Sequence, residues 1–404
     1  MTKHASLAVL FALSAGCGAR SELIVPGLDG GAPSTSFPPG CQWQLGDRVR
    51  IAEDVERAVA PTPAVAAPPA LASNHVLFAW NSLSLIPGAR TARYATHTLA
   101  LAFNGRPIAP AQAVFDREEP HNLLGLLTNM SLVRTASGFA LLTWRGSTGC
   151  SAVRVDDRGA FVSITDAFSA GNYCDDLDSL DDGALRVWVG GRPIGTGRFP
   201  TLHTVEWMDI ARDGALGPAT RGAFDVIARV TYGDRTGVAL VTEPTQLTAR
   251  LVNAAGRFEG NALALQPLPN NAPIEQSTMR VISDGALALW GAGPSVNVAR
   301  FDRRRALQER WALELATGGA TVASASADVR AGLLFVTWTT SAHESFAQVF
   351  DRSGTALSTR LALRDGAAVT RTQIVATPDG ALVVGTSGDG ASWESFAAPL
   401  RCAR

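Results

Sequence analysis

The densest group of residues able to do chemistry is an acidic run, CDDLDSLDD, at residues 174–182. Carboxylate oxygens at short spacing are the ligands that Ca²⁺ prefers in proteins. The run lacks the D-x-[DN]-x-[DN]-G spacing of a calcium loop, however, and acidic loops are usually solvated. We therefore expect no cofactor in the protein, with Ca²⁺ at this segment as the alternative.

A second chemical candidate is Cys17, which follows a basic start and an apolar run of about a dozen residues. Such a run suits a secretion signal but is too short to span a bilayer as a helix. Leu13-Ser14-Ala15-Gly16-Cys17 resembles a bacterial lipobox, in which small residues precede the lipidated cysteine. An ordinary secretion signal is the alternative, because Ser14 stands where a lipobox usually has Leu. Either way, we expect the mature chain to be extracytoplasmic, where disulfides form.

Motifs of common enzyme classes are absent from the sequence. It contains no H-E-x-x-H, C-x-x-C, G-x-S-x-G or G-x-G-x-x-G, and its histidines show no metal-ligand spacing. With a formal net charge of −1 and 18% charged residues, it has no basic patch that would indicate nucleic-acid binding. These observations favour a binding protein over an enzyme.

The elements that must position any site come from a repeated unit. Short apolar runs, most of which follow a turn glycine, recur along the chain and end at Trp80, Trp144, Trp188, Val241, Trp290, Trp338 and Gly385. Successive anchors are 44 to 64 residues apart, and a repeat near 50 residues indicates an array of similar supersecondary units.

Each unit has the pattern of four short strands joined by tight turns, such as SDG (283–285) and PDG (378–380). We therefore predict an all-β fold, a β-propeller of seven four-stranded blades, since one blade cannot bury both of its faces alone. Six or eight blades are the alternatives. The long first interval, with residues 118–127 inside it, indicates an insertion. The anchor tryptophans are possible stacking platforms for sugars, but their recurrence at one position favours packing between blades.

The last repeat is one strand short. The segment WQLGDRVRIA (43–52) can supply its outer strand beside SFAAPL (395–400), so that the N-terminus completes the last blade. This arrangement places Cys41 next to Cys402. Of the three pairings that four cysteines allow, it favours Cys41–Cys402 together with Cys150–Cys174.

Propellers generally bind ligands at the mouth of the central channel, where loops lead into the innermost strands. In the predicted register these segments hold six candidate ligand-binding residues: Asn129, Asp175, Asp178, Glu275, Gln276 and Arg371. Their mixed charge selects no ligand class. The leading hypothesis is a binding or scaffolding module for a protein, peptide or glycan partner. The alternatives are an envelope enzyme acting on glycans through paired channel carboxylates, and a purely structural propeller.

The whole chain resembles uncharacterised Gram-negative bacterial lipoproteins with a β-propeller domain. The resemblance rests on the lipobox-like site, the CGARSEL sequence at residues 17–23 and the degenerate repeat. It implies a lipid anchor, and Gly18 after Cys17 favours the outer membrane. We expect a signal peptide at 1–16, a lipidated Cys17 with a Gly/Pro/Ser linker to residue 40, and a propeller domain at 41–404. We further expect a monomer that contacts the membrane through its lipid anchor only.

Overall fold

The structure is a computed structural model. It describes Phe37 and residues 40–54, 70–72, 74–85, 88, 91–120, 131–144, 149–168, 173–190, 204–223, 226–268, 274, 276–282, 284–316, 318–363, 368–388 and 393–403. The expected signal peptide, Cys17 and two candidate ligand-binding residues, Asn129 and Glu275, lie outside this part.

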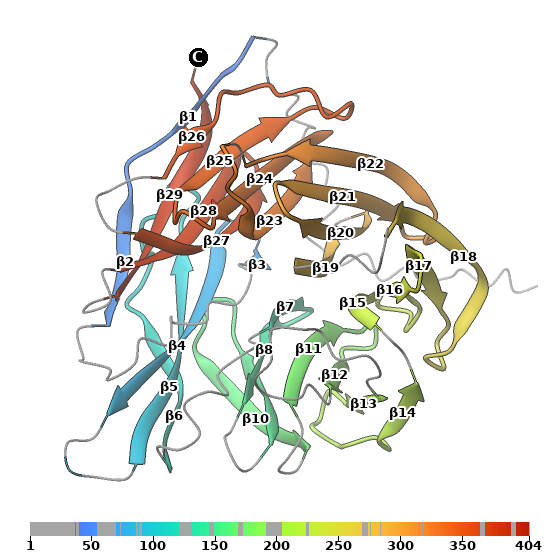
Figure 1. Cartoon of the computed structure of the whole chain (residues 1–404). Coiled ribbons are helices and arrows are strands. Elements are labelled where there is room, and N and C mark those ends of the chain that lie inside the picture. The colour runs from blue at the N-terminus through green and yellow to red at the C-terminus, as the bar shows by residue number, and fades with distance from the viewer. Residues whose placement is uncertain are drawn as a thin grey trace, which may run out of the picture.

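Every regular element in the described part of the chain is a β-strand, and the strands form seven antiparallel sheets arranged as a ring (Figure 1). Blade 1 consists of β3 (Ala70–Leu71), β4 (Val76–Leu85), β5 (Thr91–Leu101) and β6 (Gln112–Pro120). Blade 2 consists of β7 (Ser131–Thr135), β8 (Gly138–Trp144), β9 (Cys150–Val155) and β10 (Phe161–Phe168). Blade 3 consists of β11 (Tyr173–Ser179), β12 (Leu185–Gly190), β13 (Thr204–Ile210) and β14 (Thr220–Ala223).

Blade 4 consists of β15 (Val226–Thr231), β16 (Gly237–Glu243), β17 (Gln246–Val252) and β18 (Phe258–Pro267). Blade 5 consists of β19 (Gln276–Ile282), β20 (Gly285–Ala292), β21 (Ser295–Asp302) and β22 (Leu307–Glu314). Blade 6 consists of β23 (Val322–Arg330), β24 (Leu333–Thr340), β25 (Ser345–Phe350) and β26 (Leu361–Ala362). Blade 7 comprises β27 (Ala368–Thr377), β28 (Gly380–Gly388) and β29 (Trp393–Ala403), with β1 (Gln42–Leu45) and β2 (Val49–Asp54) outside them. The prediction of a seven-bladed propeller is confirmed.

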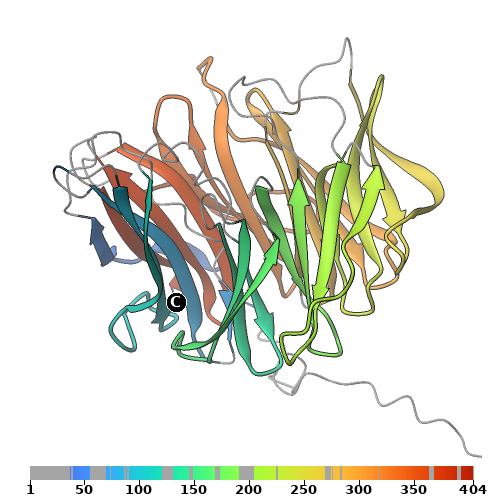
Figure 2. The same ribbon diagram turned by 90° about the horizontal axis from the view of Figure 1, so that it is seen from below.

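The disc has two distinct faces, because the four strands of each blade alternate in direction. The turn between the first and second strands and the turn between the third and fourth lie on one face, here called the turn face. The remaining connections lie on the opposite loop face. Figure 2 shows the disc edge-on, with the strands running between the faces. Turns of neighbouring blades contact each other on the turn face, as in the hydrogen bond from Asp181 N to Gly233 O at 2.9 Å.

The glycine that begins several of the apolar second strands has a steric cause. Gly138, Gly285 and Gly380 begin the second strands of their blades and have φ angles of 139°, 159° and 146°. A Cβ atom at these positions would lie 1.8 to 2.3 Å from a backbone carbonyl oxygen of the third strand. Only glycine fits there without displacing the sheet.

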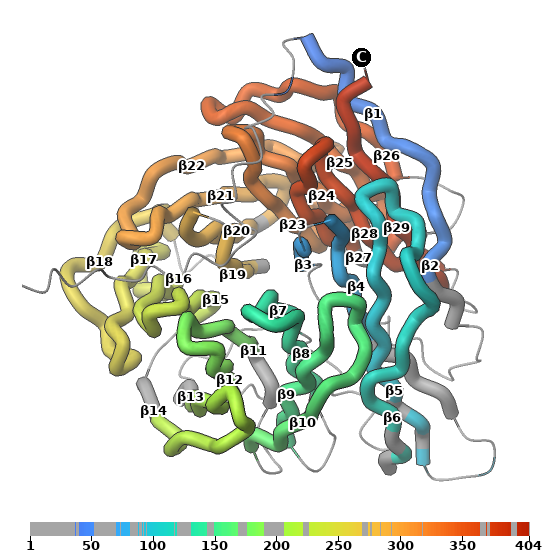
Figure 3. The backbone as a smooth tube through the Cα atoms, turned by 180° about the vertical axis from the view of Figure 1, so that it is seen from behind, coloured from blue at the N-terminus to red at the C-terminus, as the bar shows by residue number. Residues whose placement is uncertain are grey.

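The N-terminal segment closes the ring as expected. β1 pairs with the end of β29 and β2 with its beginning, and Gly46 N between them donates to Pro399 O at 2.7 Å. Figure 3 shows β1 and β2 along the outer edge of β29. A disulfide joins Cys41 to Cys402, which confirms the predicted clasp. Cys150 is also disulfide-bonded, but the Cys174 side chain lies outside the described residues, so that second pairing stays a prediction.

Apolar clusters fill six of the seven boundaries between blades in the described part of the chain. Trp80, Trp290 and Trp338 are buried within three of these clusters. Trp188 is buried at the seventh boundary. These four anchor tryptophans therefore pack between blades as predicted, while the Trp144 side chain is outside the described residues. Among those residues, no helix long and apolar enough to cross a membrane is found.

Candidate functional site

The innermost strands around the channel are β3, β7, β11, β15, β19, β23 and β27 (Figure 1). Four of the six candidate ligand-binding residues lie on them: Asp175 and Asp178 on β11, Gln276 on β19 and Arg371 on β27. Of these four, only the Asp178 side chain belongs to the described part of the structure. The ligand-binding role proposed for the set stays a prediction.

Asp178 does not lie at the mouth of the channel. It is the residue before the last of β11, which places it near the turn face, and it is 4% exposed. Its Oδ2 accepts a hydrogen bond from Trp188 Nε1 at 2.7 Å. Asp178 therefore takes part in the packing between blades 3 and 4.

The turn-face half of the channel is crossed by Arg280, from β19. Its Nη1 donates to Ile374 O on β27 at 3.0 Å, and its Nη2 donates to Ala327 O on β23. Asp328 Oδ1 lies 3.0 Å from the same guanidinium. Burial lowers the pKa of Arg280, and the negative charge of Asp328 opposes that shift. One side chain thus ties together the inner strands of blades 5, 6 and 7.

Other polar side chains also link neighbouring inner strands. Asp328 Oδ2 accepts from Ala376 N at 2.7 Å, which connects blade 6 to blade 7. Ser131 Oγ donates to Asp176 Oδ1 at 2.8 Å, which connects blade 2 to blade 3. Ser277 Oγ donates to Ile227 O at 2.8 Å, which connects blade 5 to blade 4. Arg280, Asp328 and Ser277 therefore satisfy backbone groups at the free edges of the inner strands.

The boundary between blades 3 and 4 differs in kind from the other six. Among the described residues, its buried apolar cluster consists of Trp188 and Trp207, with ring centroids 5.2 Å apart. Six charged side chains lie beside these rings or contact one another there, and we call them the polar seam: Asp178, Asp182, Arg186, Asp209, Arg229 and Arg235. Burying charges in this way requires that they be paired and hydrogen-bonded.

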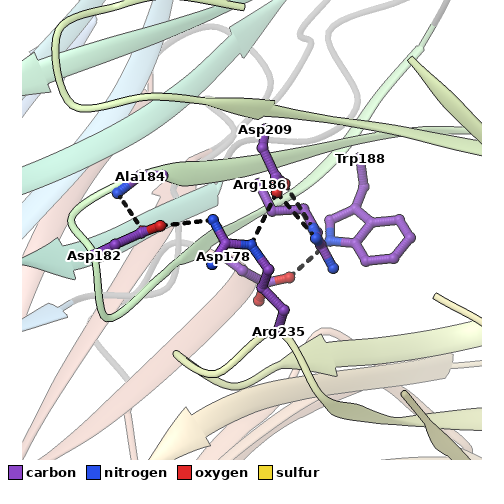
Figure 4. Close-up of polar contacts among 7 residues, drawn as sticks. All are labelled: Asp178, Asp182, Ala184, Arg186, Trp188, Asp209 and Arg235. Atoms are coloured by element: carbon purple, nitrogen blue, oxygen red, sulfur yellow. Dashed lines mark hydrogen bonds and ion pairs between the residues drawn. The ribbon is translucent and has the colours of Figure 1, made fainter. Parts of the chain in front are cut away.

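The centre of the polar seam is a bidentate ion pair. Arg186 Nε and Nη2 donate to the two carboxylate oxygens of Asp209 at 2.7 and 3.1 Å (Figure 4). The two residues face each other across β12 and β13. The guanidinium carbon of Arg186 also lies 5.9 Å and 5.8 Å from the ring centroids of Trp188 and Trp207. This pairing and stacking hold a buried Arg in one orientation.

Blade 4 contributes two more cations to the polar seam. Arg235 Nη2 lies 2.7 Å from Asp182 Oδ2, and its Nε lies 3.2 Å from Asp209 Oδ2. The hydrogen bond from Arg235 holds the pKa of Asp182 below its ordinary value. Arg229 lies 4.3 Å from the Trp188 ring centroid. The seam thus runs from the exposed Asp182 inward to the buried Arg186 and Asp178.

Burial raises the pKa of Asp178, and hydrogen bonds from Thr231 and Trp188 together with the charge of Arg229 partly oppose that rise. A buried carboxyl can carry a proton above the pH at which an exposed one loses it. Among the described residues, no group of three His, Cys, Asp or Glu could hold a metal ion. The Asp residues of the 174–182 run that the structure describes contact different neighbours instead of converging.

The sequence analysis did not identify the polar seam, although a signal for it is present. RVW (186–188) and WMD (207–209) each place a charge and a Trp two residues apart, so both side chains lie on one face of a strand. The two segments pair in register, Arg186 with Asp209 and Trp188 with Trp207. A search for complementary pairs on consecutive strands would have found this row.

Fold and site together define the class of this protein, a disulfide-closed seven-bladed β-propeller. The sequence matches no protein-family model, and it matches no curated protein. Three similar solved structures are the polysaccharide lyase Uly1, a protein of unknown function from Dyadobacter fermentans and the periplasmic gluconolactonase PpgL of Pseudomonas aeruginosa.

They are 10%, 9% and 13% identical to this chain, with TM-scores of 0.48, 0.48 and 0.47. The alignments cover 89%, 91% and 80% of this chain, and 99%, 100% and 96% of the other chains. The activities in those names are stated of those proteins.

Proposed function

We propose that this chain is a membrane-tethered, extracytoplasmic β-propeller that binds a protein, peptide or glycan partner at its loop face. The observation that carries the proposal is that carboxylates on the innermost strands, in the described part of the chain, are engaged in structural hydrogen bonds. Asp176, Asp178 and Asp328 each accept a hydrogen bond from a neighbouring strand or blade. Groups held in this way make the ring a rigid frame for a presented surface.

The geometry favours a binding module over an enzyme acting on glycans. Such an enzyme needs two carboxylates that face each other across one pocket. Asp176 and Asp178 lie two positions apart on β11, but the first contacts Ser131 of blade 2 and the second contacts Trp188 beside blade 4. Neither is directed at the other.

The loop face is the surface proposed for the partner. Asp175, Gln276 and Arg371 lie in the loop-face halves of β11, β19 and β27, and the proposal extends to Asn129 and Glu275, which are outside the described residues. Lipidation of Cys17, proposed from its lipobox-like context, would hold the disc at the outer membrane and leave this face available. A monomer is sufficient for such a role.

In-cell photo-crosslinking from matched positions tests the proposal. A photoreactive amino acid replaces Thr245 or Ala342, which are exposed in turns of the loop face, or Arg158 or Leu357, which are exposed on the turn face. We expect both loop-face positions to give the same adduct and both turn-face positions to lack it. In a parallel assay, the protein is incubated with envelope polysaccharide, and the release of new polysaccharide chain ends is measured. Release of new chain ends, with no specific adduct, would replace the binding module with an enzyme.

A further inference from the structure

The N-terminal chain reaches the propeller on the turn face. The Phe37 ring packs edge-on against Trp43 of β1 and Phe335 of β24, with centroids 5.0 and 6.3 Å apart. Phe335 is the third residue of a second strand and therefore lies near the turn face. Gln42 pairs with Ala403 at the same end of blade 7. Phe37, the first residue that the structure describes, therefore lies at the turn face, on the side opposite the loop face.

Exposed apolar side chains are concentrated on that same face. Among the described residues, eight large hydrophobic side chains are exposed, and six of them lie at turn-face ends of strands or in the adjoining turns. These six are Ile108, Phe161, Val162, Leu216, Val281 and Leu357, which are 42% to 58% exposed. The other two, Ile164 and Leu263, lie further along outer strands.

Most of this apolar set comes from one structural position. Ile108, Phe161, Val162, Leu216 and Leu357 each follow the glycine of the turn between the third and fourth strands. Those turns occur in blades 1, 2, 3 and 6, so the side chains are spread around the rim of the disc. Phe161 and Val162 are adjacent at the start of β10 and form the largest local exposure. Apolar side chains spread over one face suit a broad flat surface better than a single small ligand.

The length of the preceding chain limits what that surface can be. Phe37 lies twenty positions after Cys17, and the intervening chain spans at most about 70 Å when extended. As a Gly/Ser-type coil, they would average about 25 Å. A lipid on Cys17 therefore holds the turn face closer to the bilayer than the loop face. The exposed guanidinium groups of Arg106, Arg158 and Arg352 in the same turns can reach lipid phosphates beside the apolar side chains.

We propose that the turn face docks onto the phospholipid surface, with Phe161, Val162 and the other rim side chains in the interfacial layer. This inference rests on the proposed lipid tether, and it adds a second membrane contact made by the folded domain itself. Docking in this orientation directs the loop face, and any partner bound there, away from the membrane.

Depth-dependent fluorescence quenching tests the docking. The full lipidated protein, carrying a Val162→Cys or a matched Ala342→Cys substitution labelled with an environment-sensitive dye, is reconstituted into phosphatidylethanolamine/phosphatidylglycerol vesicles containing a lipid-attached quencher. We expect a blue shift and loss of emission at position 162 and neither change at position 342. Phe161→Ser with a dye at Leu216→Cys should reduce the docked-to-undocked ratio several-fold, since about half of a large aromatic side chain would no longer be buried in the interface.

The outcomes separate the two proposals. If the unlabelled protein does not incorporate palmitate and does not float with the vesicles, the tether fails and the proposed function fails with it. If the protein floats but the dye at position 162 is no more quenched than the dye at 342, the tether stands and the docking inference is overturned. Non-reducing electrophoresis of both labelled variants checks that the Cys41–Cys402 disulfide is intact.

Discussion

The ion pair at the centre of the polar seam gives an asymmetric prediction. The Arg186 side chain is 4% exposed, whereas that of Asp209 is 28% exposed. Asp209 also contacts Arg235, so it keeps a cation when Arg186 is removed. Among the described residues, Arg186 forms an ion pair with no carboxylate other than that of Asp209. The two single substitutions should therefore have different consequences.

The magnitudes follow from what each substitution leaves behind. Asp209→Asn keeps the shape but leaves a buried guanidinium without its counter-charge, and breaking a buried pair in this way costs about 3–5 kcal/mol. Because Asp209 is partly exposed to solvent, we expect the cost of Asp209→Asn at the lower end of this range, about 3 kcal/mol. Arg186→Met keeps an apolar chain between Trp188 and Trp207 and leaves Asp209 with Arg235, so we expect a cost of about 1 kcal/mol.

Urea unfolding at neutral pH, followed by both circular dichroism and tryptophan fluorescence, measures these free energies. The control is the double variant Arg186→Met/Asp209→Leu, which replaces the pair with apolar side chains and should lie within about 1–2 kcal/mol of the native protein. A cost for Arg186→Met equal to or above that for Asp209→Asn would refute the reasoning. It would mean that the packing of the Arg side chain, and not its charge balance, holds the boundary together.

Three further predictions concern other parts of the frame. Because burial raises the pKa of Asp178, its contribution to stability is fully present below the unfolded pKa of 3.8 and is lost as the pH rises through the folded pKa. As the pH rises above 3.8, the native protein should lose unfolding free energy relative to the Asp178→Asn variant, which carries no titrating group at this position. A difference between the two proteins that does not change with pH would contradict this. Gly285→Ala should destabilise the protein by about 2 kcal/mol or more, because the added Cβ has no space. The control Gly293→Ala has a positive φ but open space around it, and it should cost about 1 kcal/mol. Equal losses of stability in thermal unfolding would contradict the steric account. Cys41→Ser should lower the unfolding free energy by about 2–5 kcal/mol. Mild reduction of the Cys41–Cys402 disulfide should destabilise the native protein by the same amount. No loss of stability in either case would show that strand pairing alone closes the ring.

The architecture could be predicted from the sequence because its causes are local and repeated. A glycine with a positive φ stands at or just before the start of five of the seven apolar second strands, at Gly138, Gly183, Gly285, Gly332 and Gly380, and alternation of apolar residues defines the strands themselves. Cys41 and Cys402 flank the segments that complete the last blade, so their pairing followed from strand order. The positions of the anchor tryptophans between blades followed from their recurrence at one point of the repeat.

The candidate site was less predictable. Asp178 was expected at the channel mouth, but the structure places it near the turn face, covered by Trp188. The sequence indicates that a strand alternates between two faces, yet both faces of a blade are buried against neighbours. A polar residue in a blade therefore cannot be assigned to solvent, and its partner is contributed by another strand or blade.

The sequence by itself thus indicated a ring of four-stranded blades, with seven favoured over six or eight, and the turns that separate the strands, since these depend on residues close together in the chain or on their period. It also indicated the closure of the ring, because the N-terminal segment supplies the strand that the last repeat lacks and brings Cys41 to Cys402. Only the tertiary structure decided that blades 3 and 4 meet through charges, because Arg186, Asp209 and Arg235 come together from two blades. It also decided that the chain enters on the turn face with the exposed apolar rim, since that depends on where Phe37 packs in the closed ring.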